Sequence, residues 1–233
     1  MKTKYIILDN VKIAYCEHGS GENLLLLHGN LQNKSVFRKY QKEYFSNFHT
    51  FAVDSRGFGQ STSKDSEYSI EKYSDDIINF CKKLGINKTY VIGFSDGGNV
   101  CLFLAKKNPE IFTKIIAISP NYLVNGLTDE TIKILKKIYN VLIFLQKIKL
   151  PMKKTINKWE LMMKDIGITD EDLININANI LIMYADNDLI KEEHIFKMAE
   201  LIKNNKTKKI LKSTHTEIIN KEETIKEIIE YLK

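Results

Sequence analysis

The sequence predicts an α/β fold with a mostly parallel central sheet of about eight strands flanked by helices. Segments with the pattern of strands alternate along the chain with amphipathic segments typical of helices, the order that produces a parallel sheet. Residues 23–27 (NLLLL) and 114–118 (KIIAI) are continuously apolar, as expected of strands buried on both faces. The chain has 233 residues, 43% of them hydrophobic, which is enough for one large domain with its own core.

The expected elements begin with a hairpin and continue as alternating strands and helices. The first two strands meet at Asp9-Asn10, which favours a tight turn, so they are expected to form an antiparallel edge. Gly85 ends a helical pattern of apolar residues and is a typical helix stop. The expected strands are 4–8, 11–16, 23–27, 49–53, 88–92, 114–118, 179–184 and 208–212, and the expected helices are 35–45, 70–84, 97–107, 192–203 and 222–232.

The gap between the strands at 114–118 and 179–184 is too long for a single crossover. Residues 128–148 carry apolar side chains at helical spacing, and a second helical stretch holds Trp159, the only tryptophan. We therefore expect a short helical cap at 121–172, inserted after the sixth strand of a core formed by residues 1–120 and 173–233. The apolar residues of the cap form either its own core or part of the wall of an apolar pocket.

Composition argues against several classes of function. The net charge is +6, but 33 of the 35 basic residues are lysines, spread along the chain among acidic residues. Nucleic-acid recognition favours arginine forks or clustered basic stripes, so we expect a solvated lysine surface and no nucleic-acid partner. No run approaches 18 apolar residues, so no membrane span is expected. Three cysteines and the lack of a secretory signal indicate reduced thiols and a cytoplasmic location.

Residues 93–97 (GFSDG) match the pattern G-x-S-x-G between an expected strand and an expected helix. A serine at such a turn, here Ser95, is held in a strained conformation, and glycines two residues away on each side let the chain pass. The amino terminus of the following helix supplies a free N–H group and the positive end of the helix dipole. This context favours a nucleophilic serine over an ordinary glycine turn.

A serine hydroxyl needs a base to become a nucleophile. In this arrangement the acid and then the histidine are expected after the serine, which leaves His194 and His215 as bases. His194 falls inside an expected helix, whereas His215 follows the last expected strand in a loop that can reach over the sheet, so we assign His215. The acid is expected after the strand at 179–184, where Asp186 and Asp188 are both candidates. Turn position alone does not separate them.

A second donor for an oxyanion is expected in the turn after the strand at 23–27. The N–H of Asn30, or alternatively that of Leu31, would join the N–H of Asp96. His28 is expected to be structural. The expected substrate contacts are Leu31, Phe94 and Trp159.

Five segments together resemble the α/β-hydrolase family, in its small single-domain branch with a helical cap. They are LLLLHGN (24–30), VDSRGFGQS (53–61), VIGFSDGGN (91–99), ILIMYADNDLI (180–190) and THTEII (214–219). In that family the acid lies three residues after a small residue that ends the strand. Ala185 has that place here, so the resemblance implies Asp188 rather than Asp186, and it implies a structural role for the loop 54–59. Thr214 and Ala185 stand where the family commonly has glycine, and neither change removes a reacting group.

The resemblance implies a cofactor-free and metal-free serine hydrolase that cleaves small to medium carboxylic esters through an acyl-enzyme. Ser95, His215 and Asp188 would form the triad, with Asn30 and Asp96 at the oxyanion hole. The same triad serves thioesterases, amidases and C–C bond hydrolases, because fold does not decide the substrate. Two further alternatives are a slow-turnover ligand-binding or signalling relative, and a lipase at membrane surfaces, suggested by VLIFL (141–145) with lysines nearby.

Overall fold

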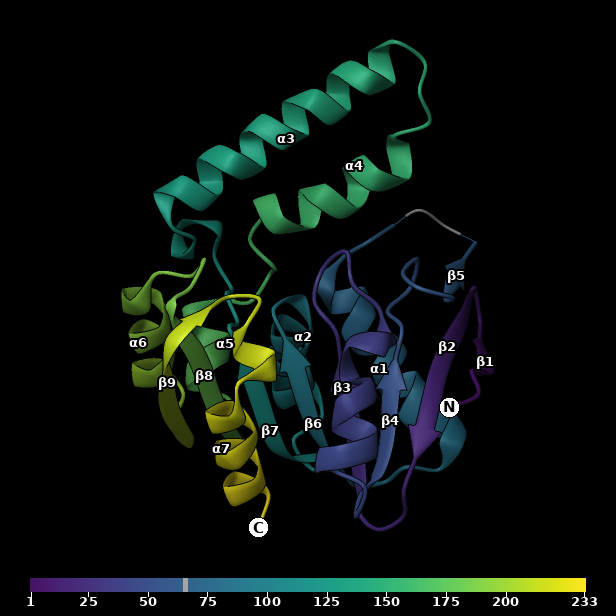
Figure 1. The fold of residues 1–233 in the computed structure, drawn as a ribbon, viewed down its shortest axis with the longest axis vertical. Helices are drawn as coiled ribbons and strands as arrows, with labels where there is room; N and C mark the ends of the chain where they lie inside the picture. Colours follow the sequence, from purple (N-terminus) through teal and green to yellow (C-terminus); the bar gives the residue numbers. More distant parts are fainter. Residues whose placement is uncertain (65–66) are drawn as a thin grey trace.

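Nine strands form one central sheet in the residues that the computed structural model describes, which are 1–64 and 67–233 (Figure 1). Their order across the sheet is β1-β2-β4-β3-β6-β7-β8-β9, and β5 pairs with β2. The strands are β1 Lys4–Leu8, β2 Val11–His18, β3 Asn23–Leu27, β4 His49–Val53, β5 Thr62–Ser63, β6 Thr89–Phe94, β7 Phe112–Ile118, β8 Asn179–Asn187 and β9 Asn205–Thr214.

The expected mostly parallel sheet with an antiparallel edge is confirmed. β1 pairs antiparallel with β2, and β2 pairs antiparallel with β4, while the neighbours from β4 through β3, β6, β7 and β8 to β9 are parallel. The sheet has one strand more than expected, because Thr62–Ser63 is too short to show a sequence pattern. Since parallel strands end at the same edge, the loops after β3, β6, β7, β8 and β9 gather there.

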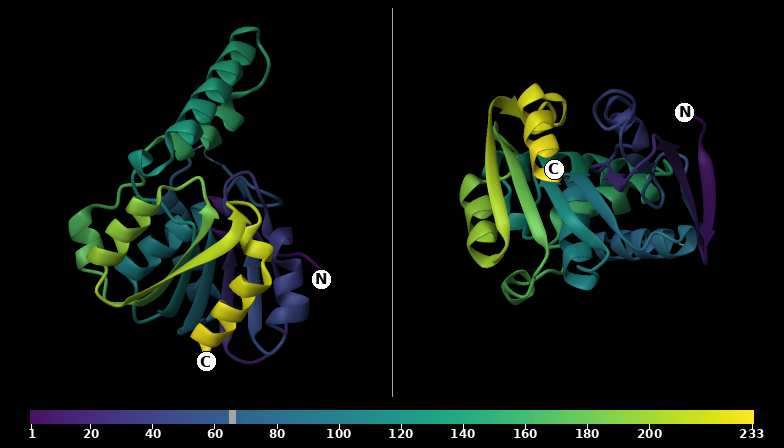
Figure 2. Two further views of the ribbon diagram at one scale, coloured as in Figure 1. Left: turned by 60° about the vertical axis from the view of Figure 1, so that its left-hand side comes forward. Right: turned by 90° about the horizontal axis from the view of Figure 1, so that it is seen from below.

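Helices cover both faces of the sheet. Apolar residues of α1, α2 and α6 share one core with the sheet, and those of α7 and of the short helical turns η1 and η2 share another on the opposite face (Figures 1 and 2). The helices are α1 Ile70–Leu84, α2 Asp96–Lys107, α3 Asp129–Lys147, α4 Lys153–Glu160, α5 Asp170–Ile174, α6 Glu192–Leu201 and α7 Glu222–Leu232. The short turns are η1 Lys34–Phe37, η2 Tyr40–Tyr44, η3 Val124–Gly126, η4 Leu161–Met163 and η5 Ile218–Asn220.

The continuous apolar runs are buried on both sides, as the sequence indicates. In β3, Leu25 and Leu27 enter the core under α1 and α2, whereas Leu24 and Leu26 enter the core under α7. This alternation follows from the two-residue period of a strand, and both sets of leucines are almost fully shielded from solvent.

The single helix expected at 35–45 is instead two short turns, a 3₁₀ turn (η1) and a π turn (η2). The rings of Phe37 and Tyr40 are fully buried against the sheet, and the Tyr40 hydroxyl donates a hydrogen bond to the Ile219 carbonyl. Tertiary contacts therefore override the helical propensity of this segment.

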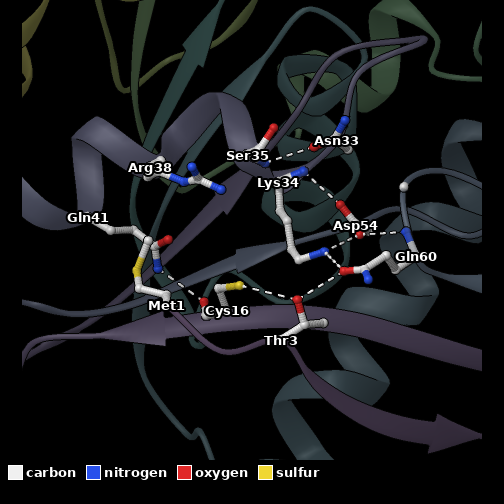
Figure 3. Close-up of a pocket in the computed structure, with 11 residues that line it drawn as sticks. Met1, Thr3, Cys16, Asn33, Lys34, Ser35, Arg38, Gln41, Asp54 and Gln60 are labelled. Carbon is white, nitrogen blue, oxygen red and sulfur yellow. Dashed lines mark hydrogen bonds and ion pairs between the residues drawn. The ribbon is translucent and has the colours of Figure 1, made fainter.

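A buried ion pair fixes the start of η1 to the loop after β4 (Figure 3). Lys34 Nζ lies 2.6 Å from Asp54 Oδ2, and Asp54 also accepts the Lys34 and Gln60 backbone N–H groups. Gly59 has a left-handed φ of +52°, and a Cβ there would lie 2.3 Å from Asp54 Oδ2. The conformation of this loop therefore depends on Asp54 and on a glycine at 59, which fits the structural role that the resemblance implies.

The helices α3 and α4 form a hairpin that projects beyond the carboxyl ends of the strands (Figures 1 and 2). They account for the helical stretches expected between 121 and 172. The two helices are joined by side-chain contacts, including a hydrogen bond from the Tyr139 hydroxyl to Glu160 Oε1. Among the helices that the structure describes, α3 included, none is long and apolar enough to cross a membrane.

Candidate active site

Ser95 occupies a sharp turn between β6 and α2. Its backbone has φ 53° and ψ −117°, a conformation that non-glycine residues rarely adopt. The glycines on either side are needed, because a Cβ at Gly93 would lie 2.0 Å from the Gly97 carbonyl oxygen, and one at Gly97 would lie 2.1 Å from the Leu27 carbonyl oxygen. The Ser95 N–H donates to the Ile118 carbonyl at 2.8 Å, which ties the strained turn to the neighbouring strand.

The turn places Ser95 within hydrogen-bond reach of His215. Ser95 Oγ lies 3.1 Å from His215 Nε2, and His215 Nδ1 lies 2.6 Å from Asp188 Oδ1. Ser95, His215 and Asp188 follow β6, β9 and β8. Asp188 and His215 are 27 positions apart in the chain, and Ser95 and His215 are 120 positions apart. The structure thus brings together Ser95, His215 and the aspartate, Asp188, that the family resemblance favours over Asp186. Asp188 and His215 are both buried, so little water competes for the hydrogen bond between them.

Asp188 is held by three further donors. Its Oδ2 accepts a 2.6 Å hydrogen bond from the Ser119 hydroxyl and a 2.9 Å bond from the Ala185 N–H, and its Oδ1 lies 3.4 Å from the Ile190 N–H. Burial acts to raise the pKa of Asp188, but the hydrogen bond and charge of His215, with the bonds from Ser119 and Ala185, outweigh it and hold the pKa below its usual range. The carboxylate is therefore ionised at neutral pH and can orient the imidazole.

Asp186 has a different place from Asp188. Its two carboxylate oxygens accept the backbone N–H groups of Lys212 and Ser213 at 2.7 and 2.8 Å. Lys212 has a left-handed φ of 51°, so Asp186 holds the irregular end of β9 that leads to His215. The two aspartates that sequence position could not separate thus differ in their partners.

The other two histidines considered lie away from Ser95 Oγ. His28 is buried, with Nδ1 2.7 Å from the Gly29 carbonyl and Nε2 accepting the Ser55 N–H, so both ring nitrogens are used by the backbone. His194 stacks on Tyr122 and accepts its N–H through Nε2 at 3.3 Å. Burial lowers the pKa of His194 to about 4. Both histidines therefore have structural contacts.

The two residues expected at the oxyanion hole contact each other through their side chains. Asn30 Nδ2 donates to Asp96 Oδ2 at 2.9 Å and to the Lys158 carbonyl of α4 at 3.0 Å. Asp96 is the first residue of α2, so its N–H has no partner within the helix. Burial raises the pKa of Asp96 to about 6, against the opposing effects of the Asn30 hydrogen bond and the His215 charge.

A cavity of about 190 Å³ lies between this group and the base of the α3–α4 hairpin. Ser95, His215, Asn30 and Asp96 line it on the side of the sheet. Most of the remaining wall is apolar and is formed by Phe94, Leu127, Leu135, Leu161, Met162, Leu189 and Ile190.

Two of the three expected substrate contacts lie outside this cavity. Trp159 faces the inside of the hairpin, where its partly buried indole Nε1–H donates to the Leu135 carbonyl at 3.1 Å. Leu31 is about half exposed in a left-handed turn with φ 57°, which directs the chain out of the cavity wall. Phe94 does line the cavity. The indole therefore packs the hairpin, while Leu135 and Met162 supply the apolar wall.

Sequence reasoning missed several polar residues of the site. Ser119 follows β7 directly, at the same sheet edge as Ser95, and its φ of 50° is also left-handed. Asn99 and Asn121 line the cavity and bond to each other, with the Asn121 N–H donating to Asn99 Oδ1 at 2.6 Å. The available signal was two polar residues, Ser119 and Asn121, directly after a buried strand. Within the described residues, no group of three or more His, Cys, Asp or Glu side chains is placed to hold a metal ion.

Comparison with known proteins bears on the family. A family model for the alpha/beta hydrolase fold matches residues 22–142, just over half of the chain. The 2-(acetamidomethylene)succinate hydrolase of Mesorhizobium japonicum is 32% identical over 116 residues, which are 50% of this chain and 42% of that protein. The chain therefore spans less than half the length of the curated relatives that it matches.

Two solved structures share the fold at low sequence identity. A meta-cleavage product hydrolase from Pseudomonas fluorescens IP01 superposes with a TM-score of 0.81 at 17% identity, over 98% of this chain and 97% of that one. A thermophilic esterase from Thermogutta terrifontis superposes with a TM-score of 0.79 at 18% identity, over 100% of this chain and 98% of that one. Together with the family model that matches more than half of the sequence, these observations show that the chain belongs to the α/β-hydrolase fold family.

Proposed function

We propose that this protein is a serine hydrolase that cleaves carboxylic esters through an acyl-enzyme. The observation that carries the proposal is the continuous hydrogen-bonded series from Ser95 Oγ through His215 to Asp188, with Ser95 on a strained turn at the wall of a cavity. A nucleophile, a base and a group that orients the base, in this geometry, are the parts that acyl transfer needs.

In the first half of the reaction, Ser95 Oγ attacks the ester carbonyl carbon while His215 Nε2 takes the hydroxyl proton. Asp188 accepts the Nδ1–H of His215 and stabilises the imidazolium that forms. Collapse of the tetrahedral intermediate breaks the bond to the alcohol oxygen, and His215 Nε2 returns its proton to that oxygen. The products of this half are an alcohol and an acyl group on Ser95.

In the second half, water enters the site and His215 Nε2 takes one of its protons. The resulting hydroxide attacks the acyl carbon, the Ser95–acyl bond breaks, and the proton returns to Ser95 Oγ. The carboxylic acid then leaves. In both halves the negative charge on the carbonyl oxygen would be stabilised by the N–H groups of Asp96 and Asn30.

The α3–α4 hairpin is proposed to act as a cap, spanning about residues 121–172, that closes the acyl side of the site. The cavity of about 190 Å³ is smaller than most drug-sized ligand pockets, and its wall is largely apolar. A short apolar acyl group fits these properties. The Asn30 hydrogen bond to the Lys158 carbonyl couples the proposed oxyanion turn to α4, so a movement of the hairpin would also move one of the proposed donors.

The proposal is tested by hydrolysis of p-nitrophenyl esters from acetate to dodecanoate. We expect turnover that is greatest for short chains, and a fall of about 10⁴-fold or more in Ser95→Ala and His215→Ala. His49→Ala is the control, because His49 lies at the opposite, amino-terminal end of β4 and should leave turnover unchanged. If wild-type protein is inert on esters but hydrolyses matched thioesters, amides or C–C substrates, the triad mechanism stands and the ester is the wrong substrate class. Equal activity in Ser95→Ala would reject the mechanism.

A further inference from the structure

The outer face of α3 carries an apolar stripe that no described residue covers. Val141, Phe144 and Ile148 are 51%, 61% and 55% exposed, and Ile134 is 50% exposed. With 100° between successive residues, these four positions fall within about 80° of the helix circumference, an arc that also contains the exposed Lys137. Exposed apolar residues on protein surfaces are normally scattered singly, so a stripe of this kind indicates a binding surface.

The inner face of α3 is already occupied. Leu135 is buried and lines the active-site cavity, and its carbonyl accepts the Trp159 indole N–H. Tyr139 donates its hydroxyl to Glu160 near the end of α4. The packing of the hairpin and the wall of the cavity therefore account for one face of α3 and leave the outer stripe without a structural role.

The positive charge of the protein is concentrated in the same hairpin. Residues 131–159 contain eight lysines and no aspartate or glutamate. The hairpin as a whole, residues 129–160, has these eight lysines and three acidic residues, which leaves 27 basic and 26 acidic residues in the rest of the chain. The lysines are thus less evenly spread than the whole sequence suggests. None of the eight forms an ion pair with a residue that the structure describes, and Lys158 instead donates to the Gly57 carbonyl. The other seven are Lys133, Lys136, Lys137, Lys147, Lys149, Lys153 and Lys154.

We infer that the outer face of α3 and the tip of the α3–α4 hairpin bind the surface of an anionic lipid bilayer. A helix with an apolar stripe beside lysines can lie in the interface, with its apolar side chains among the acyl chains and its lysines against lipid phosphates. The hairpin projects from the rest of the molecule, so it can reach a flat surface without obstruction (Figures 1 and 2). Because α3 is not apolar enough to span a bilayer, it would lie on the membrane surface.

The combination of charge and apolar surface favours an anionic bilayer over a nucleic acid and over a second copy of the chain. A nucleic acid would pair with the lysines but would leave Val141, Phe144 and Ile148 in water. A second copy of the chain, docked through the same stripe, would bring eight more lysines against the first eight at the cost of like-charge repulsion. An anionic bilayer satisfies both features at once. The inference does not depend on the proposed hydrolysis.

The test is sedimentation of the protein with vesicles of phosphatidylcholine, alone or mixed with phosphatidylglycerol. We expect binding to the mixed vesicles, little binding to phosphatidylcholine alone, and release by high salt. Phe144→Glu should weaken binding by about tenfold or more, because it places a carboxylate in the apolar stripe. Leu211→Glu is the matched control, since Leu211 on β9 is also 61% exposed but lies away from the hairpin.

A second variant tests the charge separately. Lys147→Gln with Lys149→Gln should weaken binding by about thirtyfold, from roughly 1 kcal/mol for each lysine near an anionic surface. Thermal unfolding of each variant shows whether the fold is retained. The inference is overturned if wild-type protein does not bind mixed vesicles, if it binds both vesicle types equally, or if Leu211→Glu weakens binding as much as Phe144→Glu. Binding to a DNA duplex in place of vesicles would also overturn it.

Discussion

Replacement of Asp96 by asparagine should change how stability depends on pH. Asp96 is buried beside the cavity, and its pKa is raised to about 6, above the value near 4 that an aspartate has in an unfolded chain. The folded protein therefore holds the proton more tightly. The stabilising contribution of the protonated side chain is complete below pH 4 and is lost as the pH rises through 6.

The size of the effect follows from the two pKa values. A difference of about two pKa units corresponds to about 3 kcal/mol between pH 4 and pH 8. Asparagine cannot ionise, so Asp96→Asn should avoid this loss. Its amide oxygen can still accept the hydrogen bond from Asn30 Nδ2.

The assay is urea denaturation of wild type and Asp96→Asn at pH 4 and pH 8. The free energy of unfolding of the variant, relative to wild type, should rise by about 3 kcal/mol across this range. Asp186→Asn is the control: hydrogen bonds from the Ser213 and Lys212 N–H groups lower the pKa of Asp186, so the stability of this variant relative to wild type should not rise from pH 4 to pH 8. If the relative stability of Asp96→Asn does not rise either, ionisation of the buried Asp96 carboxylate does not destabilise the fold and the raised pKa is wrong.

Four substitutions separate the roles of other residues. Ser119→Ala should lower kcat/KM by about tenfold to a hundredfold without unfolding the protein, because a hydrogen bond to a charged group is worth about 1.5–3 kcal/mol; unchanged kinetics would show that Asp188 is held without it. Asp186→Asn should lower the melting temperature more than it lowers kcat, and a loss of activity with full stability would make Asp186 part of the chemistry. Gly97→Ala should prevent folding, because its Cβ meets the Leu27 carbonyl oxygen. Gly85→Ala meets no atom within 4 Å and should cost only about 1 kcal/mol.

The sheet could be predicted from the sequence because its strands have strong, simple patterns. Residues 23–27 and 114–118 are continuous apolar runs, and the structure places them in β3 and β7, paired on both sides. The helix α1 was expected at 70–84 and is observed there, ended by Gly85 in the left-handed conformation that glycine favours. Local pattern and tertiary environment agree in these elements.

Elements whose conformation depends on distant residues were harder to predict. The segment 35–45 has helical composition, but the buried Lys34–Asp54 ion pair and the burial of Tyr40 hold it in two irregular turns. The short helix α5 was missed, although Thr169 and Asp172 form a capping box that a search for S/T-x-x-D/E would have found.

The candidate site shows the same division. Ser95, His215 and Asp188 each lie at the end of a strand that could be recognised, so chain order and the family resemblance were enough to choose them. Ser119 could not be chosen, because its contact with Asp188 depends on the register of β7 against β8, which no local pattern reveals. The position of Trp159 depends on how α3 packs on α4, which a local pattern does not reveal, so the sequence did not show that its indole lies outside the cavity wall.

The most direct test of the account is labelling of the protein by a fluorophosphonate, followed by mass spectrometry of the modified peptide. We expect one phosphonylated residue, Ser95, and a labelling rate that falls by about a hundredfold or more in His215→Ala, because the serine then has no base. Labelling at another serine, or labelling of Ser95 at the same rate without His215, would contradict the claim that His215 activates Ser95.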